Sequence, residues 1–323
     1  MIAPQMRPIY CVICGTACTT DKQALYDDRY GYDGLFPMDV CTGCGHISLR
    51  TPLTPDLLKN LYTDYYPRSC LSLDEFQPSQ SSEGFSAWLN GLKRSTFRWV
   101  PENVKVLDIG CGFGQSLAYH QARGCDAYGV EADENIKKVA EKFGFNVHIG
   151  LFDPKQYEPN FFDYVTLDQV LEHVIDPIKT LQGMAYVLKP QGMAIISTPN
   201  ANGWGVRLFG RYWINWHAPY HLQHFSVESM RIAAEKAGLK IEYFRTLTAS
   251  EWLLYQWIHL LTFPAPGKPS QFWSLKPQKS LKTKLVIKLL SLMHLTRINH
   301  IITRLFDALG SGDNYLFLLK KHE

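Results

Sequence analysis

The fold of this 323-residue chain is decided by the stretch Val106-Leu107-Asp108-Ile109-Gly110-Cys111-Gly112-Phe113-Gly114. An apolar strand, residues 104–109, runs here into a turn with glycine at every second position. Glycine permits positive φ and lets backbone N–H groups approach a ligand closely. Because residues 115–123 are compatible with a helix, the stretch predicts a strand, a glycine turn and a helix, with a ligand at the helix N-terminus.

The spacing of the glycines distinguishes between kinds of ligand. A dinucleotide fingerprint, G-x-G-x-x-G, would need glycine at position 115, where this chain has Gln115. The order D-x-G-x-G-x-G resembles instead the first motif of the class I S-adenosylmethionine (SAM) methyltransferases. That resemblance implies an α/β fold, a Rossmann-like sheet of seven strands with helices on both faces. It also implies cofactor contacts by Asp108, Gly110, Cys111, Gly112 and Gly114.

Two further strands follow with the spacing of this family. The second, residues 126–130, is followed by Glu131, which lies 23 residues after Asp108. An acidic side chain in that position can accept hydrogen bonds from both ribose hydroxyls of an adenosine. After the third strand, residues 146–150, the family often carries an acid for the adenine amino group. Here Asp153 is a weak candidate for that role, and Phe152 is expected to pack against the adenine ring.

The fourth strand, residues 162–170, resembles the motif that faces the methionine part of SAM, which implies roles for Asp168 and Gln169. Residues 188–192 are expected to form a turn before the fifth strand, 193–198. Glu172-His173 resembles part of an E-x-x-E-H metal pattern of small-RNA 2′-O-methyltransferases and some ubiquinone-pathway O-methyltransferases. Gln169 replaces the first glutamate of that pattern, which weakens a hard-cation site, so a structural role for His173 is favoured.

The N-terminal region carries two cysteine pairs with metal-ligand spacing. Cys11-Val12-Ile13-Cys14 and Cys41-Thr42-Gly43-Cys44 are separated by 26 residues, and Gly15 and Gly45 follow them at equivalent positions. Four thiolates complete the tetrahedron of a structural zinc site, so Cys11, Cys14, Cys41 and Cys44 are the predicted ligands. Cys18 and His46 are alternative ligands close in sequence. Cys70, Cys125 and Cys111 have no partner spacing and are interpreted as ordinary small residues.

Residues 1–75 are predicted to form a zinc-ribbon head and a connecting segment. They contain no cluster of Lys and Arg, so the phosphate-binding charge of a nucleic-acid-binding ribbon is missing. With the tyrosine-rich stretch 61–67, the head resembles that of zinc-headed small-molecule methyltransferases, including sugar C-methyltransferases, in which this stretch helps to close the pocket. Those sugar enzymes carry a further C-terminal Rossmann-like domain that this chain lacks, so sugar C-methylation stays an alternative.

A loop after the fifth strand, residues 213–226, holds three histidines and four large aromatic side chains. Methyl transfer to a hydroxyl needs alignment of the acceptor and removal of its proton. Neutral histidine has a pKa suited to that step. His221 and His217 are therefore candidates for the general base, with Tyr220 as an alternative base or orienting group. For each histidine, a role in the core or in capping the following helix stays open.

A basic insertion of residues 249–313 is predicted between the sixth strand, 241–247, and the seventh, 315–319. From Trp252 through Phe306 the chain has no Asp or Glu but eight Lys and Arg. Two apolar helical stretches, 252–263 and 281–309, flank a proline-rich linker. Two interpretations stay open: a lid over the acceptor pocket, or basic amphipathic helices in peripheral contact with a membrane through residues 252–309.

Composition agrees with a globular enzyme, since 46% of the residues are hydrophobic and the net charge is only +3. Residues 76–323 are expected to form the methyltransferase domain. The sequence thus predicts a SAM-dependent methyltransferase with a structural zinc, acting at oxygen on a small-molecule or saccharide acceptor that is free or lipid-linked. We expect it in the cytoplasm or at the inner membrane face, with reduced cysteines. A zinc-ribbon protein that binds or modifies RNA is the alternative from a different class.

Overall fold

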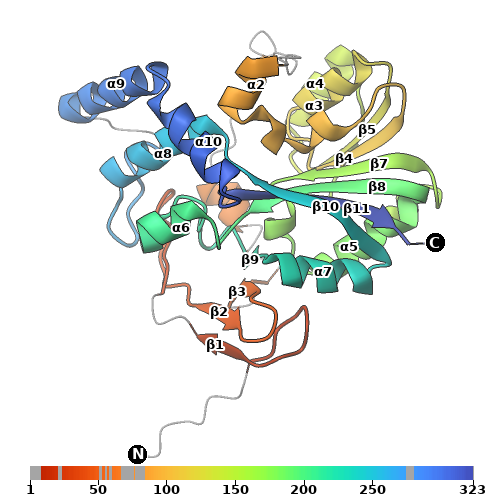
Figure 1. Ribbon diagram of the computed structural model, residues 1–323, viewed down its shortest axis with the longest axis horizontal. Helices are drawn as coiled ribbons and strands as arrows, with labels where there is room; N and C mark the ends of the chain where they lie inside the picture. Colours follow the sequence, from red (N-terminus) through yellow and green to blue (C-terminus); the bar gives the residue numbers. More distant parts are fainter. Residues whose placement is uncertain are drawn as a thin grey trace, which may run out of the picture.

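A sheet of seven strands forms the centre of the computed structural model (Figure 1). The structure describes residues 9–20, 24–50, 53–54, 57, 60–66, 76, 84–273 and 280–322. The strand order is β10-β11-β8-β7-β4-β5-β6. The strands are β4 (Lys105–Ile109), β5 (Asp126–Glu131), β6 (Asn146–Ile149), β7 (Phe162–Asp168), β8 (Leu188–Pro199), β10 (Leu239–Leu247) and β11 (Asn314–Lys321). The predicted Rossmann-like sheet is confirmed.

Helices cover both faces of the sheet (Figure 1). On one face lie α2 (Gly84–Asn90), α3 (Gln115–Gln121) and α4 (Ile136–Phe143), and on the other lie α5 (Pro177–Val187) and α7 (Val227–Lys236). Leu117 of α3 and Ile136 of α4 belong to one buried cluster, and Leu181 of α5 belongs to the other. Because parallel strands buried on both faces are apolar throughout, the strand sequences carry little alternation.

The last strand, β11, is antiparallel to both of its neighbours, β8 and β10. Strands β10 and β11 therefore pair like the two strands of a hairpin, and the predicted insertion forms the connection between them. One expectation at the other end of β8 is wrong: residues 188–192 belong to the strand and are not a turn before it. Helix α5 ends at Val187, Leu188 pairs with Phe162, and a register shift precedes the pairing of Tyr164 with Met193. The irregular pairing accommodates the intervening Pro190, which has no N–H to donate.

The N-terminal head forms a second, antiparallel sheet of four strands, β1 (Cys18–Thr20), β2 (Met38–Cys41), β3 (Ile47–Leu49) and β9 (Gln223–His224). Strand β9 comes from the loop that precedes α7, and His224 pairs with Ile47. The Lys236 Nζ also donates to the Ile13 carbonyl over 2.6 Å. The sequence predicted that the head ends at residue 75. In the structure, however, the sheet of the head is completed by β9, a strand from the main domain.

The insertion is helical, as expected, but its described residues form three helices. They are α8 (Ser250–Leu261), α9 (Leu281–Leu295) and α10 (Ile298–Ala308). The expected single stretch 281–309 is wrong, because Arg297 adopts a φ of +67° and the axes of α9 and α10 differ by 61°. Among the described helices none is by itself long and apolar enough to cross a membrane, whereas α9 and α10 taken together meet that test. Cys70, Lys276 and Lys279 lie outside the described residues.

Candidate active site

The glycine turn lies at the carboxyl ends of β4 and β5. The Gly110 and Cys111 amides both donate to the Val130 carbonyl, and the Gly112 amide donates to Glu131 Oε2 over 2.9 Å. Gly110 has a φ of +74°, and a Cβ there would lie 2.5 Å from Val170 Cγ2. At Gly112, φ is +55° and a Cβ would meet no atom within 4 Å. The turn is therefore closely packed at Gly110 and open at Gly112, where a ligand can reach the backbone.

Asp108 lies beneath this turn, fully buried. Its carboxylate accepts from the Thr166 hydroxyl over 2.6 Å and from the Ser116 hydroxyl. Burial raises its pKa to about 6, although both hydroxyls act in the opposite direction. Because Ser116 is in the first turn of α3 and Thr166 is in β7, Asp108 ties the turn to its helix and to the neighbouring strand. A direct contact of Asp108 with the cofactor stays a prediction.

Three other residues were predicted to contact the cofactor, and two of them, Glu131 and Cys111, lie at the turn. Glu131 is the last residue of β5, and its Oε1 accepts from the Asp133 amide over 2.9 Å. The Cys111 side chain is buried against Gly129, so only its backbone faces the turn. The Phe152 ring packs against Gly183 of α5. Glu131 is thus well placed beside the turn, and a contact of Phe152 with adenine stays a prediction.

The end of β7 brings Asp168 and Gln169 to the same edge of the sheet. The Asp168 Oδ1 lies 3.6 Å from Arg94 Nη1, while burial raises the pKa of the Asp168 carboxyl. Gln169 has a φ of +59° and donates from Nε2 to Ser197 Oγ over 2.9 Å. Sequence reasoning missed Arg94. It lies in a short 3-10 turn, Leu92–Arg94, and no motif surrounds it.

A buried carboxyl and two imidazoles form a cluster directly beyond β7. Glu172 and His173 lie in the 3-10 turn Leu171–His173, and His221 reaches them from the histidine loop. One possible ligand atom from each of the three lies within 4.8 Å of the others. The Glu172 Oε2 accepts from Thr198 Oγ1 over 3.0 Å, whereas Oε1 has no partner among the described residues. Burial raises the pKa of Glu172 to about 8.

Both imidazoles of this cluster have defined tautomers. The His221 Nδ1 lies 2.7 Å from the Asn215 carbonyl, and His173 Nδ1 lies 2.9 Å from the Tyr220 carbonyl. Because a carbonyl only accepts, each Nδ1 carries the proton and each Nε2 offers a lone pair. Burial lowers the pKa of His221 well below its usual value and that of His173 to about 4. Both rings are therefore neutral near pH 7.

The other residues of the histidine loop have different surroundings. The His217 ring stacks on Tyr220 at 4.9 Å and meets His221 edge-on at 4.9 Å, and burial lowers the His217 pKa well below its usual value. Neither His217 Nε2 nor Tyr220 Oη has a hydrogen-bond partner among the described residues. His224 is fully buried against Trp216 and fills the core. The structure thus brings His217, Tyr220 and His221 together, and the His224 ring packs edge-on against His221 at 5.9 Å.

Tyrosines from the head and the connecting segment surround Tyr220. Tyr62 and Tyr66 come from a short π-helical turn, Leu61–Tyr65, and the residue after it. Their ring centroids lie 5.7 and 5.5 Å from that of Tyr220, and the Tyr30 centroid lies 5.2 Å from it. Tyr62 Oη also contacts His173 Nδ1 over 3.0 Å. The tyrosine-rich stretch was noted in the sequence, but Tyr30 of the head was missed because no pattern connects it to this site.

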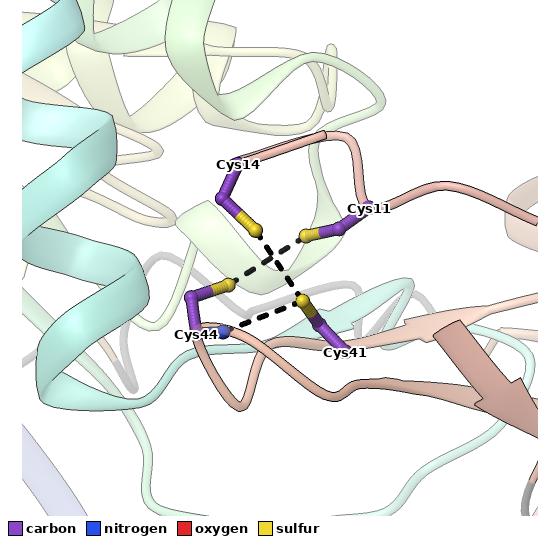
Figure 2. A group of neighbouring side chains, drawn as sticks. All are labelled: Cys11, Cys14, Cys41 and Cys44. Atoms are coloured by element: carbon purple, nitrogen blue, oxygen red, sulfur yellow. Dashed lines mark hydrogen bonds between the residues drawn. The ribbon is translucent and has the colours of Figure 1, made fainter. Parts of the chain in front are cut away.

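The four head cysteines converge as the spacing predicts (Figure 2). Cys11 and Cys44 Sγ atoms lie 3.6 Å apart, and those of Cys14 and Cys41 lie 3.3 Å apart. Sulfurs bound to one zinc at ~2.3 Å would lie about 3.8 Å apart, so the cluster could hold zinc. The Ile13 and Gly43 amides donate to the ligand sulfurs over 3.4 Å, which stabilises thiolates. The cluster includes neither of the alternative ligands, Cys18 and His46.

Comparisons with known proteins agree with this architecture. A family model described as "Methyltransferase domain" matches residues 74–243, which is more than half of the chain. The chain is 34% identical over 126 residues to the ubiquinone biosynthesis O-methyltransferase of Thiobacillus denitrificans, a match that covers 35% of this chain and 54% of the relative. The match to the enzyme of the same name from Idiomarina loihiensis is 36% identical over 105 residues and covers 30% and 43%. The chain thus spans about half the length of the curated relatives it matches.

Two solved methyltransferase structures are similar to parts of the chain. A phosphoethanolamine N-methyltransferase 2 of Haemonchus contortus with S-adenosyl-L-methionine has a TM-score of 0.49 and 19% identity, and the match covers 90% of this chain and 63% of that one. A SAM-dependent methyltransferase from Archaeoglobus fulgidus has a TM-score of 0.41 and 21% identity, with 69% and 90% covered. On the strength of the family match, the chain belongs to the methyltransferase-domain family.

Proposed function

We propose that this protein transfers a methyl group from SAM to a hydroxyl oxygen of a small-molecule acceptor, with saccharides among the candidates. The family match supports methyl transfer, and the name O-methyltransferase of the relatives supports oxygen as the atom that is methylated. The single observation that carries the proposal is the buried cluster of Glu172, His173 and His221, which lies directly beyond the β7 end that carries Asp168 and Gln169.

The residues at the sheet edge fit the cofactor. The open backbone at Gly112 and the adjacent Glu131 carboxylate would hold the adenosine part, since a carboxylate at this strand end suits ribose hydroxyls. Asp168 and Arg94 would lie at the methionine part, which carries both a carboxylate and an ammonium group. When bound there, SAM supplies an electrophilic methyl group.

The histidine cluster would prepare the acceptor. His221 would accept the hydroxyl proton at Nε2 while the acceptor oxygen bonds to the methyl carbon and the carbon–sulfur bond breaks. The Asn215 carbonyl holds the tautomer that this step needs. His217, whose ring packs edge-on against His221, and Tyr220, which stacks on His217, would orient the acceptor through His217 Nε2 and Tyr220 Oη, atoms that have no hydrogen-bond partner among the described residues. Exclusion of water by the tyrosines would strengthen these interactions.

A specific observation favours a second version of the same reaction. Glu172, His173 and His221 could hold a divalent cation, because one possible ligand atom of each lies within 4.8 Å of the others. In that version His221 would be the third ligand, a residue that the sequence pattern around Gln169 does not include. A bound cation would lower the pKa of the acceptor hydroxyl, and His217 would then remain as the base.

The experiment is a transfer assay with methyl-labelled SAM, using extracts and purified acceptors, together with calorimetry of SAM binding. The variant His221→Asn should lower turnover about a hundredfold or more with SAM affinity unchanged, whereas the exposed His322→Asn should change neither. Unchanged turnover in His221→Asn would remove the base, and absence of SAM binding by the wild type would refute the proposal itself. Loss of activity on chelation, restored by added Mn²⁺ or Zn²⁺, would select the second version.

A further inference from the structure

Helix α10 is amphipathic, but its polar face is buried against the protein and its apolar face is exposed. Its buried residues are polar: Asn299, His300, Thr303 and Arg304. Its exposed large side chains are apolar, namely Ile298, Ile301 and Leu305, and Leu309 just beyond its end is also exposed. A helix on a protein surface normally turns its apolar stripe inward. The outward stripe of α10 therefore faces a medium other than the core of this chain.

The polar face of α10 is fastened to the protein body by hydrogen bonds. The Arg304 guanidinium donates to the carbonyls of Trp88 and Thr248, and it lies 2.9 Å from Asp307. His300 Nε2 contacts Asn90 Oδ1 over 3.0 Å. Because buried polar groups without partners cost free energy, these bonds determine which face of the helix lies inward. The outward position of the apolar face is thus specified by the structure.

Helix α9 lies next to α10 (Figure 1), and its exposed side chains extend this apolar surface. None of its residues is buried. Its exposed leucines, at positions 281, 285, 289, 292 and 295, recur every three or four residues and so share one face. Leu281 and Leu309, at the two ends of the helix pair, are 85% and 77% exposed. On neighbouring α2, the Phe85 and Trp88 side chains are also exposed, with ring centroids 5.4 Å apart.

The charged residues of α9 and of the bend before α10 are all basic. Lys282, Lys284 and Lys288 of α9 and Arg297 at the bend are exposed, and no acidic residue occurs from position 252 to 306. The nearest acids along the chain are already engaged, Glu251 with the Tyr255 hydroxyl and Asp307 with Arg304. Exposed apolar side chains mixed with lysines, together with an exposed Trp, are typical of helices that lie in a membrane interface.

We infer that α9, α10 and the aromatic pair of α2 form a docking surface for an anionic lipid bilayer. Leucines would enter the boundary of the acyl chains while the lysines contact headgroup phosphates. A second copy of this chain fits less well, because the lysine-bearing surfaces would face each other without an acid to pair with. The bonds of the polar face keep α10 on the protein body, so the helices lie in the interface instead of crossing it. This inference is independent of the proposed methyl transfer.

Vesicle flotation of the full chain tests the inference. The protein should float with vesicles of phosphatidylcholine containing 30% phosphatidylglycerol and remain unbound with pure phosphatidylcholine. The triple variant Lys282→Glu, Lys284→Glu, Lys288→Glu should bind at least about a hundredfold more weakly, since each lysine near an anionic surface contributes roughly fivefold. The matched control, Lys137→Glu, Lys138→Glu, Lys240→Glu, makes the same charge change at exposed positions elsewhere and should bind as the wild type does.

A second pair of variants tests the apolar contribution. Leu285→Ser with Leu292→Ser should lower binding about tenfold or more, whereas Leu35→Ser with Leu151→Ser, which replaces leucines at least as exposed, should leave it unchanged. Circular dichroism and the midpoint of thermal unfolding show whether each variant is folded. The inference is overturned if the wild type does not bind anionic vesicles, if both triple variants bind equally, or if α9 variants abolish a solution dimer.

Discussion

The position of the cofactor can be tested by substituting two glycines that have similar backbone conformations, of which only one lies in the proposed cofactor site. Gly112 of the turn and Gly144 at the end of α4 have φ of +55° and +68°, and a Cβ at either would meet no atom within 4 Å. An L-residue in this region of φ costs about 1 kcal/mol. Gly112→Ala and Gly144→Ala should therefore lower the free energy of unfolding equally, by about 1 kcal/mol each.

Only one of these substitutions should affect SAM. At Gly112 the added methyl group would occupy the space through which the ligand approaches the backbone, so SAM affinity should fall at least tenfold, or about 1.4 kcal/mol. At Gly144 it should not change. Calorimetry gives the affinities, and urea unfolding gives the stabilities. Wild-type affinity in Gly112→Ala, with the expected loss of stability, would refute the assignment of the glycine turn to the cofactor.

A third variant calibrates the packing argument. In Gly110→Ala the new Cβ would lie 2.5 Å from Val170 Cγ2, in addition to the unfavourable φ. Overpacking typically costs about 1–3 kcal/mol, so the total loss of stability should be about 2–4 kcal/mol. The second substitution Val170→Ala should recover part of that loss. If Gly110→Ala were no less stable than Gly112→Ala, the turn would be more adaptable than its contacts indicate.

Two further predictions concern acid stability and zinc. His120 is fully buried, has no hydrogen-bond partner among the described residues, and has a pKa lowered to about 4 by burial. Between pH 6.5 and 4 the unfolded chain binds this proton and the native chain does not, so stability falls as the pH falls, by about 2 kcal/mol at pH 5. His120→Phe should remove that part of the acid loss, as urea unfolding at pH 5 and 8 can show, and equal pH slopes would contradict it. Cys41→Ser should abolish zinc binding and lower turnover with SAM affinity unchanged, because β3 of the head pairs with β9, which is part of the histidine loop. Substitution of the buried Cys125 in Cys125→Ser is the control. Metal analysis and the transfer assay measure both effects, and a wild type without zinc or a fully active Cys41→Ser would contradict the prediction.

Local patterns in the sequence predicted much of the sheet and its turn. The glycine turn, the strand that ends at Glu131 and the two cysteine pairs are each defined by residues close together in the chain, and backbone sterics or metal geometry give each pattern one physical meaning. Helix ends were predicted less well. The break at Arg297 was missed because it depends on a single left-handed residue between two apolar stretches that look continuous.

The acceptor side of the site was only partly predictable. The sequence drew attention to His217, Tyr220 and His221 as a group, but it assigned His173 to a structural role and considered Glu172 without His221. Their proximity results from packing between the end of β7 and a loop about fifty residues later. Tyr30 and Arg94 carry no motif at all, and they reach the site because the head and the turn after α2 fold over the sheet edge.

The sequence by itself thus determined the glycine turn, the sheet that carries it and the four cysteines that could hold zinc, because each depends on spacing along a short stretch of chain. Only the tertiary structure decided which distant side chains meet at the acceptor side and which face of α10 lies outward. Those outcomes depend on hydrogen bonds and packing between residues far apart in the chain, such as the bonds of Arg304 to Trp88 and Thr248. Composition alone could not tell a buried helix face from an exposed one, because the inward face of α10 is polar.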